Sequence, residues 1–448
     1  MTSTRKRLAG GLLLASLFLV LSVSDAHALP AFARKYGLRC SACHEAWPML
    51  NYFGQKFKDN GYQLMNDRDA PIWQNNGYWP VTFRITPNWH RESSDKVAVD
   101  QAASGLRKIS STGFDLSGLD FHTGGTLDKN ISFYVLPSSD SSGNFHFETV
   151  MGRLDNLFGS PWLNLKLGKF ELDNLVSEKR ILTLTSISGV YETYHFMPVG
   201  DGNIFGQIGD NQLGMEWLGH SANDRTRVSA AVLSSADGNV GLPFGANSYS
   251  GFFTASQAFE AGRFGVQRVG AYAMVGEAPT TFFTSGGVPI PGAIGNKSFH
   301  REGFVGLFYL HQLDFQVVTQ HGWDNAWFGA GYGQGAPNNG TGVTLPPGSR
   351  APTWNGYMVE THYVYSPQLI FIQRSEWERM SQQALPTNPK NLGNIDMYTF
   401  GFRYYPIMTS RAGFAWHNEY SWVRRRGVAP DLTDLTSSSL LTGFDFDF

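Results

Sequence analysis

The sequence predicts an all-β protein, a transmembrane antiparallel β-barrel of about sixteen strands, preceded by a small N-terminal helical segment. Three observations predict this fold. The chain of 448 residues opens with an export signal, continues with segments that alternate between apolar and polar side chains, and joins these segments by turns that are alternately short and long. A chain that combines these features is expected in a bacterial outer membrane.

The export signal occupies residues 1–28. Basic residues at 5–7 precede the apolar run "LAGGLLLASLFLVLSV", and an A-x-A cleavage site follows at residues 26–28. This order of charged, apolar and small residues is typical of a secretory signal peptide. An uncleaved anchor helix is the alternative interpretation.

A short motif, "CSACH", follows the signal and fills residues 40–44. A C-x-x-C pair occurs in redox dithiols, zinc half-sites and c-type haem attachment sites. No βαβ context for a redox dithiol surrounds the pair, and the chain has 2 cysteines in all, so a second cysteine pair for zinc is missing. The histidine directly after the second cysteine predicts one covalently bound haem c, attached through Cys40 and Cys43, with His44 as an axial ligand of the iron.

A helix is expected directly after the motif. Pro48 suits the first turn of a helix, Leu50, Phe53 and Phe57 form an apolar stripe, and the Asn-Gly pair at 60–61 is a stop signal. This stripe fits packing against a haem. It equally fits an ordinary amphipathic helix that packs on the barrel wall, and both interpretations stay open here.

The second axial ligand of the iron is predicted to be Met65. It follows the expected helix, and a thioether suits an electron-transfer haem. Met49 is too close to His44 in sequence to reach the opposite face of the haem. His90, on the first barrel strand, is the remaining candidate.

From residue 78 onward the sequence alternates with a period of two. The segments "WPVTFRITPNWH", "MYTFGFRYY" and "RAGFAWHNEYSW" each set aromatic and aliphatic residues against Arg, His, Asn or Glu. The last segment ends on "FDFDF", with Phe448 on the apolar face. Aromatic residues on the apolar faces and ionisable residues on the others indicate a lipid-facing wall around a wet lumen.

The connections support a barrel of this size. Tight turns are expected near Gln312, Pro367 and Ile407, and long loops over 276–300, 322–351, 379–394 and 424–437. Single-chain bacterial barrels have even strand numbers, so we predict sixteen, with fourteen and eighteen as alternatives. Such a barrel, formed by residues 78–448, leaves a lumen that residues 29–77 could plug. Polar wall residues such as Arg84 and His90 are expected near the haem.

The segment "ARKYGLRCSACHEAWPMLNYFGQKFKDNGYQL" (residues 33–64) resembles the N-terminal motif of the fused outer-membrane cytochrome–porin family, in which a monohaem segment precedes a porin barrel. Trp47-Pro48 stands where the family has Phe-Pro. The positions that match are Leu50, Gly54, Phe57, Asn60, Gly61 and Tyr62. The resemblance implies haem binding by Cys40, Cys43 and His44. Because its best-known members oxidise extracellular iron(II), it also implies iron as a candidate electron donor.

The sequence therefore leaves two candidate functions. The first is electron transfer across the outer membrane, between an extracellular donor or acceptor such as iron and a periplasmic c-type cytochrome, with an iron(II):cytochrome c oxidoreductase as the implied enzyme class. The alternative is a solute porin whose cytochrome segment is a plug or redox sensor. The near balance of 35 basic and 37 acidic residues argues against a nucleic-acid partner. The predicted barrel implies outer-membrane lipid as a partner.

Overall fold

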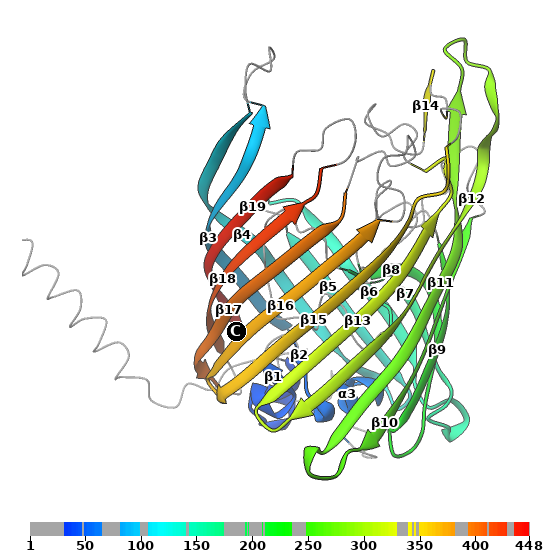
Figure 1. The fold of residues 1–448 in the computed structure, drawn as a ribbon. Helices are drawn as coiled ribbons and strands as arrows, with labels where there is room; N and C mark the ends of the chain where they lie inside the picture. Colours follow the sequence, from blue (N-terminus) through cyan, green and yellow to red (C-terminus); the bar gives the residue numbers. More distant parts are fainter. Residues whose placement is uncertain are drawn as a thin grey trace, which may run out of the picture.

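A computed structural model gives the fold of the chain (Figure 1). It describes residues 31–46, 49–64, 81–98, 106–139, 143–173, 193–194, 196, 208, 211–234, 248–328, 339–342, 345, 349–380, 393–409, 412–427 and 434–447. The expected signal peptide and Pro48, Met65 and Phe448 lie outside these residues.

Sixteen long antiparallel strands within the described residues close into a barrel. Each strand pairs with the next along the chain, except that β13 pairs directly with β15, and β19 pairs with β3 to close the ring through pairs such as Asp447 with Arg84. The three-residue β14 (Asn339–Thr341) runs parallel to the end of β11. The strands are β3 (Val81–Ala98), β4 (Leu106–Asp128), β5 (Ile131–Ser139), β6 (Phe145–Leu154), β7 (Asn164–Glu171), β8 (Asn211–His220), β9 (Thr226–Ser234), β10 (Tyr249–Glu260), β11 (Val266–Phe283), β12 (Pro289–Leu310), β13 (Leu313–Asp324), β15 (Thr353–Ser366), β16 (Leu369–Met380), β17 (Ile395–Met408), β18 (Gly413–Arg425) and β19 (Leu435–Asp447). The predicted strand number is confirmed.

The period-two alternation sorts side chains between the two faces of the wall. On β17, Phe400 is 55% exposed while Arg403 is fully buried, and on β18 Trp416 is exposed while His417 is buried. Apolar side chains therefore face outward, where lipid surrounds a barrel, and ionisable ones face the lumen. On β19 the inward residue is Asp445, which lies between Arg84 and Arg403 at 3.4 Å from each.

The short turns lie where the sequence predicts, one predicted loop is corrected, and the predicted loops over 322–351, 379–394 and 424–437 lie partly outside the described residues. His311-Gln312, Pro367-Gln368 and the turn after Met408 connect strands at one rim, and the C-terminal end of β19 lies at the same rim (Figure 1). Two short 3-10 turns, η3 (Leu157–Gly159) and η5 (Gly262–Phe264), lie in other connections. The stretch 276–300 was expected to be a loop, but β11 and β12 run through it as a long hairpin that breaks only at residues 284–288. Its prolines did not prevent pairing of the two strands. Pro279 and Pro289 each have a register partner on the facing strand.

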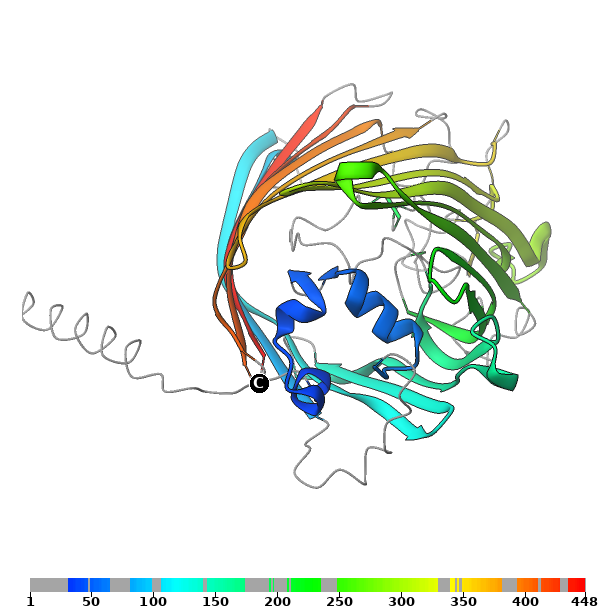
Figure 2. The same cartoon turned by 90° about the horizontal axis from the view of Figure 1, so that it is seen from below.

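A small N-terminal segment lies inside the barrel, close to the rim with the short turns (Figures 1 and 2). We call residues 31–46 and 49–64 the plug segment. It contains α2 (Ala31–Tyr36), η1 (Cys40–Ala42), β1 (His44–Ala46), β2 (Met49–Leu50) and α3 (Tyr52–Asp59).

The expected helix after the motif is present as α3, but it is shorter than the sequence pattern suggested. It begins after Asn51, whose side-chain oxygen accepts a hydrogen bond from the Gly54 amide at 2.9 Å, so Asn51 is its N-cap. Leu50 belongs to β2 and not to the helix. The helix ends before Gly61, which has a positive φ of 72°.

Phe57 of α3 and Tyr62 share one buried cluster with wall residues such as Phe170 and Tyr272. At Phe57 the apolar stripe therefore packs on the barrel wall. No helix among the described residues is long and apolar enough to cross a membrane.

Candidate functional site

The CxxCH motif forms a tight turn within the barrel. Cys40, Ser41 and Ala42 make the 3-10 turn η1, and the Cys43 amide donates to the Cys40 carbonyl at 3.1 Å. The turn brings both cysteines to one short loop, where neither is in a disulfide and both are half-buried. The Cys40 thiol donates to the Thr409 carbonyl at 3.2 Å, which ties the motif to the turn between β17 and β18.

Burial governs the protonation of the two thiols. It raises the pKa of Cys40 to about 12, with a further contribution from the carboxylate of Asp447, and it raises the pKa of Cys43 to about 11. Both groups are therefore neutral thiols at physiological pH in the folded barrel.

Helix α3 packs directly behind the motif. The backbone amide of Asn51 donates to the Cys43 carbonyl at 2.9 Å, and the Asn51 side chain donates to the Ala42 carbonyl at 3.0 Å. A side chain at Gly54 would place its Cβ 2.1 Å from the same Cys43 oxygen. The glycine is therefore required where the helix touches the turn.

His44 is the first residue of β1. The next residue, Glu45, is an acid of the site that the sequence analysis did not single out. Glu45 hydrogen-bonds to Asp314 of β13, and burial together with this neighbouring carboxylate raises the pKa of Glu45 to about 9. The pair therefore holds a proton at neutral pH. On β15, His362 lies opposite Asp314 in the strand register and bonds to Glu360 at 2.7 Å. The wall beside the motif is thus lined with ionisable groups.

The three candidates for the second axial ligand have different outcomes. Met65 lies outside the described residues, so its role stays a prediction. Met49 is buried in the wall cluster formed with Ile370 and Tyr405, and its sulfur accepts from the Gln316 amide at 2.7 Å. His90 faces the lumen further along β3, where its Nδ1 lies 3.4 Å from Glu92.

The expected wall arginine is closer to the motif. Arg84 lies opposite Asp447 in the register of β3 and β19, and Asp447 is the carboxylate that acts on the Cys40 thiol. Arg84 also lies 3.6 Å from Asp120 and 3.4 Å from Asp445. A charged network of the wall therefore reaches the CxxCH turn.

The donor set fits a covalently bound haem c. Two cysteines outside any disulfide lie on one turn, and a histidine directly follows the second of them. Thioether bonds need such thiols, and the iron needs such a nitrogen ligand. No competing disulfide or further cysteine is present in the sequence.

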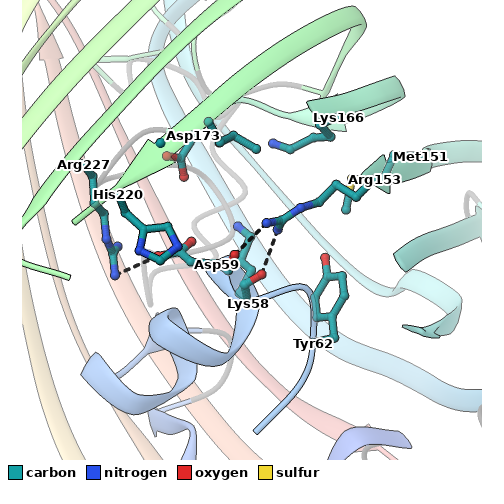
Figure 3. Close-up of a pocket in the computed structure, with 11 residues that line it drawn as sticks. Lys58, Asp59, Tyr62, Met151, Arg153, Lys166, Asp173, His220 and Arg227 are labelled. Atoms are coloured by element: carbon teal, nitrogen blue, oxygen red, sulfur yellow. Dashed lines mark hydrogen bonds and ion pairs between the residues drawn. The ribbon is translucent and has the colours of Figure 1, made fainter. Parts of the chain in front are cut away.

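A second group of residues anchors the other end of α3 in a small pocket of the wall (Figure 3). Arg153 of β6 donates to the carbonyls of Lys58 and Asp59 at 2.8 and 2.6 Å, while its Nε lies 2.8 Å from Asp155. A cation at the last carbonyls of a helix satisfies orphan acceptors and opposes the helix dipole. Arg227 of β9 adds an ion pair with the Asp59 carboxylate at 2.8 Å. The pocket is lined by Lys58, Asp59, Tyr62, Met151, Arg153, Lys166, Asp173, Leu218, Gly219, His220 and Arg227.

Replacing Gly54 by alanine should loosen the plug segment. The new Cβ would collide with the Cys43 carbonyl, and moving that carbonyl breaks its hydrogen bond to the Asn51 amide. Overpacking of this kind costs about 1–3 kcal/mol. We expect faster proteolysis of residues 31–64 in the folded barrel. Gly152→Ala is the matched control, because its Cβ would meet no atom within 4 Å. Equal proteolysis of the two variants would contradict the tight contact.

Comparison with known proteins agrees with the barrel. No protein-family model matches the sequence, and no curated protein matches it. Among solved structures, the chain is similar to the outer membrane channel DcaP of Acinetobacter baumannii, with a TM-score of 0.51 and 10% identity over 82% of this chain and 97% of that one. It is also similar to an anion-selective porin from Comamonas acidovorans, with a TM-score of 0.50 and 10% identity over 82% of this chain and 98% of that one. The chain therefore has the sixteen-stranded fold of outer-membrane porins, and the predicted outer-membrane location is confirmed at the level of the fold.

Proposed function

We propose that this protein transfers electrons across the outer membrane through one haem c that Cys40 and Cys43 bind covalently and His44 ligates. The observation that carries the proposal is the position of the CxxCH turn inside a closed barrel, where the Cys40 thiol contacts the β17–β18 turn. A haem held there supplies a one-electron couple in a membrane that otherwise insulates.

The residues around the motif have defined tasks in this proposal. Asn51 and Gly54 fix the carbonyl of Cys43 and so orient the residues that follow it. Glu45 and Asp314 share a proton on the wall beside the motif, and Arg84 with its partner aspartates sets the charge of the wall near Cys40. Burial and nearby charge of this kind tune the potential of a bound haem.

The partners follow from the resemblance in the plug segment. We propose extracellular iron(II) as electron donor and a periplasmic c-type cytochrome as acceptor, which makes the reaction that of an iron(II):cytochrome c oxidoreductase. The plug segment lies near the rim with short turns, the periplasmic rim in barrels of this type. A periplasmic carrier would therefore approach from the plugged end.

Met65→Ala should change the visible spectrum and the reduction potential without loss of covalent haem, since exchange of a thioether ligand alters the iron but leaves both thioether bonds intact. Redox titration of the purified variant measures this shift. Met49→Ala is the control, because Met49 packs in the wall. An unchanged spectrum in Met65→Ala would exclude Met65 and leave His90 as the candidate.

The fold favours a second candidate function, a solute porin whose N-terminal segment is a plug or sensor. Of the two similar structures, one is described as an outer membrane channel and the other as an anion-selective porin. In this alternative Arg153 and Arg227 would hold a gate and not a redox centre.

A reduced-minus-oxidised spectrum of intact cells tests the main proposal. We expect c-type haem bands that grow when iron(II) is supplied and that are missing in cells producing the Cys40→Ala, Cys43→Ala variant. Haem bands that ignore iron(II) would remove iron as donor. The absence of any haem band from the native protein would favour the solute porin.

A further inference from the structure

We infer that the outer wall of the barrel carries a binding site for a divalent transition-metal ion, formed by His300, Glu302 and His321. Glu302 of β12 lies opposite His321 of β13 in the strand register, and His300 lies two residues from Glu302 on the same face. One ligand atom from each of the three residues lies within 4.8 Å of the others. His300 Nε2 and Glu302 Oε2 are 3.9 Å apart.

These side chains face away from the lumen. On β12, Phe299, Arg301 and Val305 are buried on the inner side, whereas the Glu302 side chain is 52% exposed and Phe304 is 70% exposed. The cluster therefore lies on the opposite side of the wall from the plug segment, and it is a separate site from the CxxCH turn.

The cluster of His300, Glu302 and His321 lies at the border of the lipid-facing band of the wall. Toward the short-turn rim the next outward residue of β12 is the exposed Phe304, and toward the other rim the outward positions are polar, with Ser298 of β12 facing Glu277 of β11. Trp323 lies opposite His300 and has the amphipathic ring typical of the aromatic girdle. The site is thus reachable from the aqueous phase at the rim opposite the short turns.

Neighbouring side chains prepare both imidazoles for a metal. Nδ1 of His321 lies 2.9 Å from Oδ1 of Asn355 on β15, and because a carbonyl oxygen only accepts, this nitrogen carries the proton. Nε2 of His321 then keeps its lone pair, in the arrangement that orients metal-binding histidines. The His300 ring stacks on Trp323 with centroids 5.5 Å apart and planes at 7°.

The ligand chemistry selects the class of ion. Two imidazole nitrogens and one carboxylate suit zinc, copper, nickel or iron(II), whereas calcium and magnesium prefer sites made of oxygen alone. Metal–nitrogen bonds of about 2.0–2.1 Å require the ligand atoms to close in by side-chain rotation. A bound cation would neutralise Glu302, whose charge is otherwise unfavourable at the edge of the lipid. It would also link β12 to β13 and, through Asn355, to β15.

Zinc binding to the purified full-length protein in detergent micelles, measured by titration calorimetry, tests the site. We expect one site in the native protein and a loss of affinity of at least 100-fold in His300→Gln and in His321→Gln. His146→Gln, which changes an exposed histidine on β6, is the matched control and should bind zinc as the native protein does. Native affinity in both His300→Gln and His321→Gln would overturn the proposal.

The role of Asn355 has its own test. Asn355→Ala should weaken zinc binding about 10–100-fold, because groups that hydrogen-bond to metal-ligating histidines have effects of this size. Asn355→Asp should restore binding, since a carboxylate accepts the same proton. Copper(II) added to the same variants should give an electron paramagnetic resonance spectrum with nitrogen hyperfine coupling only while His300 and His321 are both present. Equal zinc affinity in Asn355→Ala and the native protein would exclude the positioning role.

Discussion

Replacing Cys40 and Cys43 together by alanine should abolish covalent haem while leaving the barrel folded. The two thiols are the only cysteines in the sequence, so no other residue can form a thioether bond. The sixteen barrel strands pair with one another without the cysteines, which lie in the plug segment. Haem staining of a denaturing gel, beside a heat-modifiability assay of the folded barrel, measures both effects.

The matched control for this variant is Ser41→Ala, which changes an exposed residue of the same turn. It should keep full haem staining. Haem that stays on the double variant through denaturation would contradict the attachment site. Loss of the folded barrel in the double variant would show that the cysteines serve structure, and the absence of staining would then say nothing of haem.

Replacing Arg153 by methionine should release α3 from the wall. The guanidinium holds the last two carbonyls of the helix and lies 2.8 Å from Asp155, a carboxylate with no exposed surface. Removing one partner of such a buried pair costs about 3–5 kcal/mol, because the other charge stays behind. We expect larger single-channel conductance in planar bilayers and rapid proteolysis of residues 31–64.

Arg225→Met is the control for this prediction. Arg225 pairs with Glu260 on the exposed part of a neighbouring connection, where ion pairs contribute little. Conductance and proteolysis should stay native in the control. A native pattern in Arg153→Met itself, with the barrel still heat-modifiable, would contradict the anchoring role of the pocket in Figure 3.

The barrel could be predicted because the alternating pattern that identifies each strand lies within that strand's own sequence. A strand repeats every two residues, so segments such as "MYTFGFRYY" reveal an outer and an inner face without knowledge of their neighbours. The short-turn rim could be predicted for the same reason, since two-residue turns such as His311-Gln312 interrupt the alternating pattern. The hairpin over 276–300 was missed because its prolines and glycines are typical of a loop. In the structure β11 and β12 nevertheless stay paired with each other through this stretch, as far as Phe283 and Pro289.

The contacts of the site could be predicted only in part. The motif at 40–44 is contiguous, so its chemistry can be read from five residues. The anchors of the plug segment are not contiguous, because Arg153 and Lys58 are 95 residues apart in sequence. The metal site on the outer wall depends on the register of β12 against β13, which no alternation pattern specifies.

The most direct test of electron transfer uses sealed proteoliposomes that contain the full-length protein and enclose a c-type cytochrome. Iron(II) is added outside, and the spectrum of the enclosed cytochrome is recorded while ion leakage is measured on the same vesicles. We expect the enclosed cytochrome to become reduced with the native protein and to stay oxidised with the Cys40→Ala, Cys43→Ala variant. A cytochrome that stays oxidised with the native protein, in vesicles that leak small ions freely, would contradict electron transfer and identify the barrel as a solute porin.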